Sequence, residues 1–243
     1  MNQYFDQASN NPYARITAQL AAEEARAAFI RKTYLHLLAA ILACATICAL
    51  ILALFDRQLE PIVRWIVSAP WHWLLVLGGF MVVSYIAERW ATSETSEQKQ
   101  YMGLGLYVVA EALLFIPLLW IAEHFAKADV IQTAGVITAI IFGTLTLVVF
   151  ITKTDFSFLR WALVFGSVAA MGAIVAGCIF GFSLGLWFSV AMVGLASISI
   201  LYNTSNIMHR YRTDQHVAAS LFLFASVALL FWYVLQILMS MDD

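Results

Sequence analysis

The stretch from Trp161 to His209 contains no Lys, Arg, Asp or Glu. A helix needs about 20 apolar residues to cross the hydrocarbon core of a bilayer, so this stretch is too long for a single crossing. We therefore predict two membrane helices joined by a hairpin that turns near Gly181 to Gly185.

The composition of the whole chain indicates an integral membrane protein. The 243 residues are 63% hydrophobic and 12% charged, with a mean hydropathy of +0.84, far outside the range of soluble domains. About seven spans with short loops would use up the chain. We expect an all-α membrane protein, a seven-transmembrane-helix bundle over 31–243, with spans at 33–55, 71–87, 101–122, 129–152, 156–180, 186–208 and 217–239. Between the first two spans we predict a loop over 57–70 with a short amphipathic piece at 62–66.

A polar tail over 1–30 precedes the first span. It lacks the apolar core of a signal peptide, which predicts a cytoplasmic lead-in. Residues 19–31 fit either a short amphipathic helix lying on the membrane or a solvated tail, and the sequence leaves both open.

The distribution of Lys and Arg predicts a cytoplasmic N-terminus and a C-terminus on the far side. In that orientation three basic residues lie outside: Arg57, Arg64 and Lys127. The others lie inside: Arg15, Arg26, Arg31, Lys32, Arg89, Lys99, Lys153, Arg160, Arg210 and Arg212.

Two polar features stand out within the spans. Ser199, Asn203 and Asn206 fall on one helical stripe, which must face protein or water and not lipid. Glu111 is the acidic residue predicted deep inside a span, where a carboxylate is costly and therefore a functional candidate. For Glu111 we weigh a role in an ion or proton path against a structural hydrogen bond to a neighbouring helix.

The histidines, the small residues and the cysteines fit structural roles better than reactive ones. The histidines His36, His72, His124 and His216 lie near predicted helix ends, which favours an interfacial location. Ala169, Ala173, Gly177 and Gly181 form a small-residue stripe, typical of tight packing inside a bundle or of a homodimer face. The three cysteines lie in apolar runs and behave as small hydrophobes.

Several functional classes find no support. The chain has no nucleophile with a base and no HExxH pattern, so we do not expect an enzyme. A net charge of −2 with a pI near 6.2 offers no surface for nucleic acid. We expect no cofactor and no bound metal.

Several stretches together resemble one family. FIRKTYLHLLAA in the first span, KTDFSFL between the fourth and fifth, and ILYNTSNIMHRY at the end of the sixth are similar to the BAX inhibitor motif family of seven-helix membrane proteins, in its bacterial branch. The amphiphilic last span fits the same pattern, and the resemblance extends over about 210 residues when the stretches are taken in order.

The resemblance implies a pair of aspartates on the sixth and seventh helices that share a proton and gate a pH-sensitive calcium leak. In this chain the matching positions are Asn203 and Ser226, so both carboxylates are missing. An Asn with a Ser has nothing to titrate, and we expect altered or absent pH gating. The family's basic partner matches Arg89. Its turn acid matches Asp155, for which capping of the following helix with Ser157 is an equal alternative.

The expected function is a calcium or other cation leak in the cell inner membrane, along a path lined by Glu111, Asn203, Asn206 and Ser226, with Arg89 as a cationic latch. Calcium would then be the transported ion. The alternative, also implied by the resemblance, is a regulator of a membrane protease or of stress survival with no transport of its own. The expected partners are the lipid bilayer and, for the regulator, another membrane protein; we expect a monomer or a weak homo-oligomer.

Overall fold

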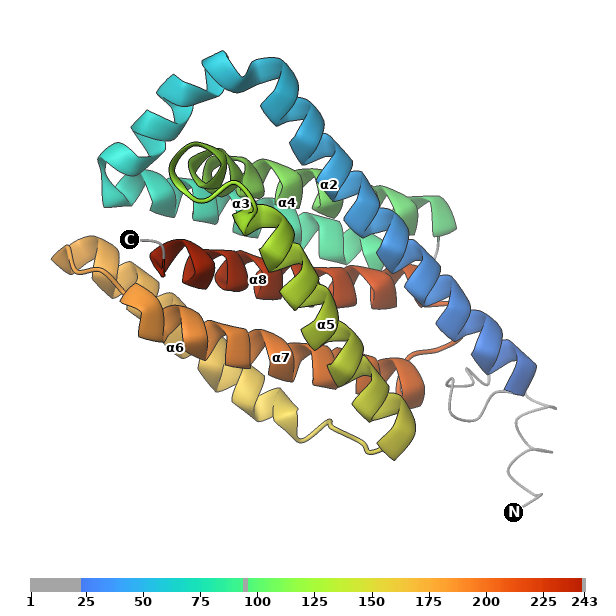
Figure 1. Cartoon of the computed structure of the whole chain (residues 1–243). Coiled ribbons are helices and arrows are strands. Elements are labelled where there is room, and N and C mark those ends of the chain that lie inside the picture. The colour runs from blue at the N-terminus through green and yellow to red at the C-terminus, as the bar shows by residue number, and fades with distance from the viewer. Residues whose placement is uncertain (1–22, 94–95, 242–243) are drawn as a thin grey trace.

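The computed structural model describes residues 23–93 and 96–241 and consists of long helices (Figure 1). Seven of them are long and apolar enough to cross a membrane, as the sequence predicts. In chain order they are α2 (Glu23–Ser68), α3 (Pro70–Ala91), α4 (Glu97–Phe125), α5 (Val130–Thr152), α6 (Leu159–Phe180), α7 (Gly185–His209) and α8 (His216–Ser240).

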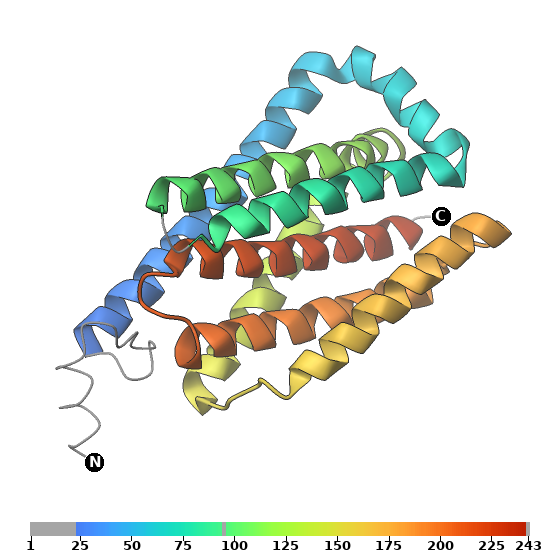
Figure 2. The ribbon, with the colours of Figure 1, turned by 180° about the vertical axis from the view of Figure 1, so that it is seen from behind.

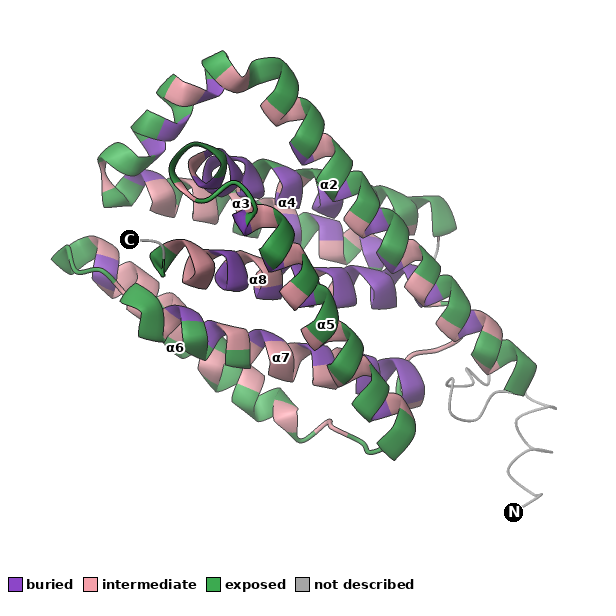
Figure 3. Cartoon of the chain, in the orientation of Figure 1, coloured by how far each residue is buried: buried purple, intermediate pink, exposed green. Residues whose placement is uncertain are grey.

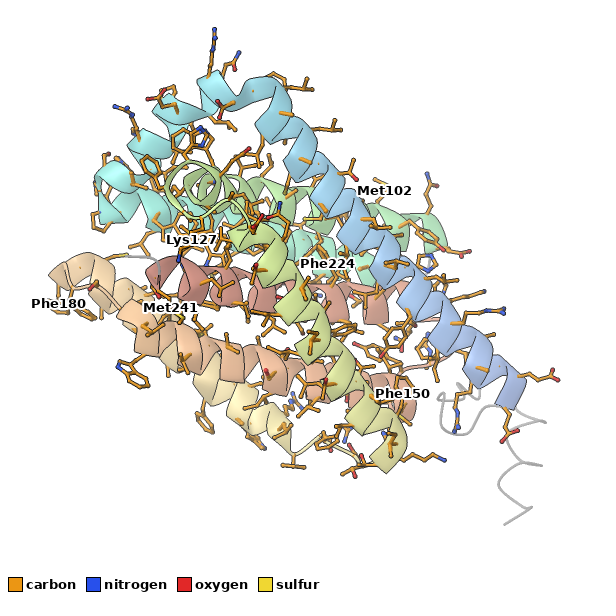
Figure 4. The ribbon with its side chains drawn as sticks, viewed as in Figure 1. Met102, Lys127, Phe150, Phe180, Phe224 and Met241 are labelled. Carbon is orange, nitrogen blue, oxygen red and sulfur yellow. The ribbon has the colours of Figure 1, made fainter. Side chains whose placement is uncertain are left out.

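Successive helices run in alternating directions, so the connections gather at two ends of the bundle (Figures 1 and 2). The start of α2 lies at the first end, which we call the N-terminal end, together with the α3–α4, α5–α6 and α7–α8 connections. We call the opposite end the C-terminal end. Figure 4 shows the side chains of Lys127, Phe180 and Met241 at this end, and those of Met102 and Phe150 toward the N-terminal end. The start of α2 and the end of α8 therefore lie at opposite ends of the bundle.

Helices α4 and α8 form the core of the bundle. Figure 3 shows buried positions concentrated on these two helices, while α6 is largely exposed. On α8 the side chains of Leu221, Leu223, Leu230 and Leu235 are fully buried. A helix that is apolar all round and surrounded by other helices is the expected centre of a membrane bundle.

Gly103 of α4 allows close contact with α3. A Cβ atom at this position would collide with backbone atoms of Ala87 and Ala91. Small residues at such crossings let two helix backbones approach, which is a main source of packing energy when lipid is the surrounding solvent.

The loop predicted over 57–70 is wrong, because helix α2 continues to Ser68. Phe55 has non-helical dihedral angles (φ −123°, ψ 16°), so the chain bends there and a second helical segment begins. Leu59, Val63 and Ile66 are buried at the i, i+4 and i+7 spacing of one helical face. The charged side chains around them occupy the other face, which makes this an amphipathic helix and not a loop.

The other predicted spans agree with the structure to within a few residues. The hairpin between the fifth and sixth spans is confirmed: Gly181 (φ 72°) ends α6 and Gly185 (φ 65°) begins α7. Both are in the left-handed region that glycine adopts without steric cost. The small-residue stripe on α6 is only partly inside the bundle, since Gly177 is buried while Ala169 and Gly181 are exposed.

The predicted polar tail falls mostly on residues 1–22, which lie outside the described residues. From Glu23 onward the lead-in is helical and continuous with the first span.

Candidate functional site

A cavity of about 1050 Å³ lies among helices α3, α4, α6, α7 and α8. At the C-terminal end of the bundle it is lined by the α6–α7 hairpin, from Gly181 to Leu186, and by Ser240. On each helix the lining ends at one residue toward the N-terminal end: Met81 on α3, Tyr107 on α4, Ser167 on α6, Asn203 on α7 and Phe222 on α8. The cavity therefore reaches from the C-terminal end past the middle of α7 and α8 and ends before the N-terminal end of the bundle.

A cluster of hydrogen-bonded polar side chains lies at this inner limit. The Asn203 side-chain amide donates to Ser226 Oγ at 2.9 Å and to Ser199 Oγ at 3.3 Å. The two serine hydroxyls are 2.8 Å apart. The backbone carbonyl of Phe222 accepts from Ser226 Oγ at 3.0 Å and from Asn203 Nδ2 at 3.3 Å. We call Ser199, Asn203 and Ser226 the polar cluster.

The packing of α7 against α8 creates the polar cluster. Ser199 and Asn203 are one turn apart on α7, so both point to the same side of that helix. Ser226 approaches from α8 and is buried, with 3% of its surface exposed. The structure thus brings Asn203 and Ser226 into direct contact. In the sequence resemblance, these are the two positions that correspond to aspartates, and here both side chains are neutral.

Glu111 lines the same cavity from α4. It is 6% exposed, which confirms that it lies deep inside the bundle. Within the described residues no Lys or Arg side chain forms an ion pair with it, and its polar neighbour is Tyr107, one turn earlier on α4. Among the described lining residues, Glu111 is the one with a carboxyl group.

Two other candidates lie away from the cavity. Asn206 is buried, and its side-chain oxygen has no hydrogen-bond partner among the described residues. Arg89 is exposed; its guanidinium donates to the hydroxyl of Tyr85 on the same helix at 2.8 and 3.1 Å and lies over that ring. The structure therefore does not bring Arg89 to the polar cluster.

Asp155 lies in the connection between α5 and α6, outside the spans. Its Oδ1 accepts from the backbone N–H of Ser157 at 2.9 Å, and its Oδ2 lies 3.7 Å from an Arg210 guanidinium nitrogen. The Ser157 hydrogen bond, aided by Arg210, lowers the pKa of the Asp155 carboxyl. Asp155 forms a local turn before α6 begins at Leu159 and so is not the cap residue of that helix; it ties this connection to the one after α7.

The structure also assembles polar contacts that the sequence does not reveal. Tyr101 Oη lies 3.2 Å from His36 Nε2 and 3.3 Å from His216 Nε2, which joins α2, α4 and α8 at the N-terminal end. At the bend of α2, Asp56 accepts from Trp120 Nε1 at 2.8 Å. These residues come from helices distant in sequence, so no spacing pattern could have indicated the contacts.

Comparison with known proteins agrees with the resemblance in the sequence. A family model described as "Inhibitor of apoptosis-promoting Bax1" matches residues 26–243. Bax inhibitor 1 of Schizosaccharomyces pombe is 29% identical over 98% of this chain and 87% of its own length. An uncharacterized protein of Pseudomonas aeruginosa is 30% identical over 65% of this chain and 68% of its own, and one of Neisseria meningitidis is 29% identical over 60% and 67%. No solved structure gives a significant match.

Proposed function

This chain belongs to the Bax inhibitor family of membrane proteins, and from that premise we propose that it is a cation leak, with calcium as the conducted ion, whose path includes the cavity. The observation that carries the proposal is that Glu111, Asn203 and Ser226 line this one cavity, although they come from three different helices. A buried carboxylate facing a cavity in a membrane protein marks an ion path by default.

The polar cluster is the proposed closure of this path. It lies where the cavity ends, and its hydrogen bonds connect α7 to α8. Because none of its three side chains titrates, a change of pH does not alter its charge. The proposed leak is therefore insensitive to pH at this point, unlike a gate built from two carboxylates that share one proton.

We place the protein in the cell inner membrane with its N-terminus in the cytoplasm. The support is the excess of Lys and Arg at the N-terminal end of the bundle, where Arg31, Lys153, Arg160 and Arg210 lie. In this orientation the cavity is on the side away from the cytoplasm.

Calcium efflux from dye-loaded proteoliposomes tests the leak. We expect the Asn203→Asp, Ser226→Asp double variant to show a stronger dependence of flux on pH than the native chain between about pH 6 and pH 8, because its paired carboxyls share a proton. Glu111→Gln should reduce the flux. No flux from folded protein at any pH, in both the native chain and the double variant, would refute the leak.

The alternative function is regulation of a membrane protease or of stress survival without transport. The neutral, hydrogen-bonded polar cluster favours it, because nothing in the cluster responds to pH and the cavity ends there. Deletion of residues 1–28 distinguishes the two functions. A regulator that binds its partner through this tail loses binding, whereas a leak retains its flux.

A further inference from the structure

Aromatic side chains contribute to the walls of the cavity that Glu111 lines. Three ring pairs contribute: Trp73 with Trp232 at 5.6 Å between centroids, Phe80 with Tyr107 at 5.9 Å, and Phe188 with Tyr233 at 5.9 Å. The faces of such rings attract cations and also provide apolar contact area.

The cavity is poorly suited to hold a calcium ion. Calcium takes six to eight oxygen ligands, and strong sites supply several carboxylates. Here Glu111 is the single carboxylate in the described lining, and the hydroxyls of Ser199 and Ser226 are already engaged within the polar cluster. The described residues contain no group of three or more His, Cys, Asp or Glu side chains that could hold a metal.

An organic cation fits these features better. One positive charge matches the one carboxylate, and an ammonium group carrying apolar substituents is stabilised by aromatic faces without needing many oxygen ligands. The volume of about 1050 Å³ is at the upper end of the range for pockets that hold small organic molecules.

The arrangement of the rings also suggests the length of the ligand. Tyr107 is one turn from Glu111 on α4 and its ring contacts Phe80 of α3. Trp73 is seven residues before Phe80 on the same helix, a distance of about 10 Å along the axis. A ligand with its ammonium group at Glu111 would therefore extend its apolar body toward Trp73 and Trp232, in the direction of the C-terminal end.

We propose that this cavity is a binding site for amphiphilic organic ammonium ions, with Glu111 as the ionic partner of the nitrogen and the aromatic walls as the site of the apolar body. The inference rests on the proposed cation path, because it assigns a ligand class to the same cavity. It adds to that path a bound ligand, an organic monocation, which is distinct from the ion that the leak conducts.

The test measures binding and not flux. Radiolabelled 4-phenylbutylamine, a cation at neutral pH, is compared in equilibrium dialysis with the neutral alcohol 4-phenylbutanol. The protein is held in lipid nanodiscs, and empty nanodiscs report partition into lipid. We expect saturable binding of one amine per chain, with the alcohol weaker by about tenfold or more, as is typical when a charge-assisted hydrogen bond is lost.

Glu111→Gln should remove the preference for the amine while the alcohol binds as before. Glu60→Gln, which changes an exposed carboxylate paired with Arg64 and outside this cavity, is the matched control and should leave the preference unchanged. Ala170→Phe places a ring in the cavity from α6 without altering Glu111, so it should abolish binding of both compounds; it also serves if Glu111→Gln fails to fold.

Equal affinity for amine and alcohol, a preference that survives Glu111→Gln, or no saturable binding by folded protein would each overturn the inference. The result is separable from the leak itself. Amine binding without calcium flux refutes the leak alone, whereas calcium flux without amine binding refutes this inference alone.

Discussion

The side-chain amide of Asn203 on α7 donates to the hydroxyl of Ser226 on α8 at 2.9 Å, and these are the positions where the family pattern places two acids. The same contact that would join two carboxylates through a shared proton here joins an amide and a hydroxyl. The α7–α8 contact is therefore formed by neutral side chains, neither of which titrates.

Ser226→Ala should destabilise the bundle. The change leaves Asn203 and Ser199 without their α8 hydroxyl partner in a partly buried setting, which costs about 1–3 kcal/mol. The measurement is the melting temperature Tm in detergent. Ser240→Ala, which removes an exposed hydroxyl bonded within its own helix, is the control and should leave Tm nearly unchanged. Equal Tm values for the two variants would mean that the polar cluster does not hold α7 to α8.

Gly103→Ala should be among the most disruptive single-methyl changes in the chain. The new Cβ would overlap backbone atoms of Ala87 and Ala91, which cannot move aside as a flexible side chain can, so α3 and α4 must separate. Forcing extra volume into a packed contact costs about 1–3 kcal/mol or more.

Gly105→Ala on the same helix provides a control for Gly103→Ala, because no atom lies within 4 Å of a Cβ there. Alanine is favoured over glycine in a helix by about 1 kcal/mol, so this variant should be neutral or slightly stabilised. Comparison of Tm for the two variants checks the prediction. Similar Tm values for the two variants would show that the close α3–α4 contact at Gly103 does not decide the effect.

Asp155→Asn should lower stability at neutral pH but not in acid. The lowered pKa of Asp155, caused first by the Ser157 N–H and then by Arg210, means that the carboxylate form stabilises the folded state. This contribution is fully present above the ordinary pKa of an aspartate, about 4, and is lost as the pH falls through the lower folded value. Since the group is exposed, we expect less than about 1 kcal/mol.

The difference in Tm between the native chain and Asp155→Asn should therefore shrink as the pH is lowered below about 4. In an Arg210→Gln background the effect of Asp155→Asn should be smaller. A Tm difference that grows toward low pH would contradict the assignment.

Hydropathy predicted most of the fold because lipid leaves so few ways to satisfy the backbone. The exception was residues 57–68, where Asp56, Arg57, Glu60 and Arg64 suggested a loop. Leu59, Val63 and Ile66 nevertheless follow the spacing of a helical face, and the amphipathic piece predicted at 62–66 lies within this helix.

The candidate site was only partly predictable. The polar stripe on one helix and the depth of Glu111 follow from local sequence, but which helices surround a cavity depends on tertiary packing. Hydropathy carries no information about neighbours, so the aromatic walls around Glu111 and the meeting of His36 with His216 could be found only in the structure.

Tyr101→Phe should loosen the N-terminal end of the bundle. The variant keeps the ring against His36 and His216 but removes the hydroxyl that both Nε2 atoms contact, at 3.2 and 3.3 Å. His216 is 7% exposed, so its nitrogen cannot recover a water partner easily, and we expect a cost of about 1–3 kcal/mol. The matched control is Tyr85→Phe, which removes an exposed hydroxyl bonded to Arg89 and should change stability by less than about 0.5 kcal/mol. A lower Tm in Tyr101→Phe but not in Tyr85→Phe would show that the Tyr101 hydroxyl stabilises the contact among α2, α4 and α8. Equal Tm values for the two variants would show that packing of the Tyr101 ring is enough to hold these helices together.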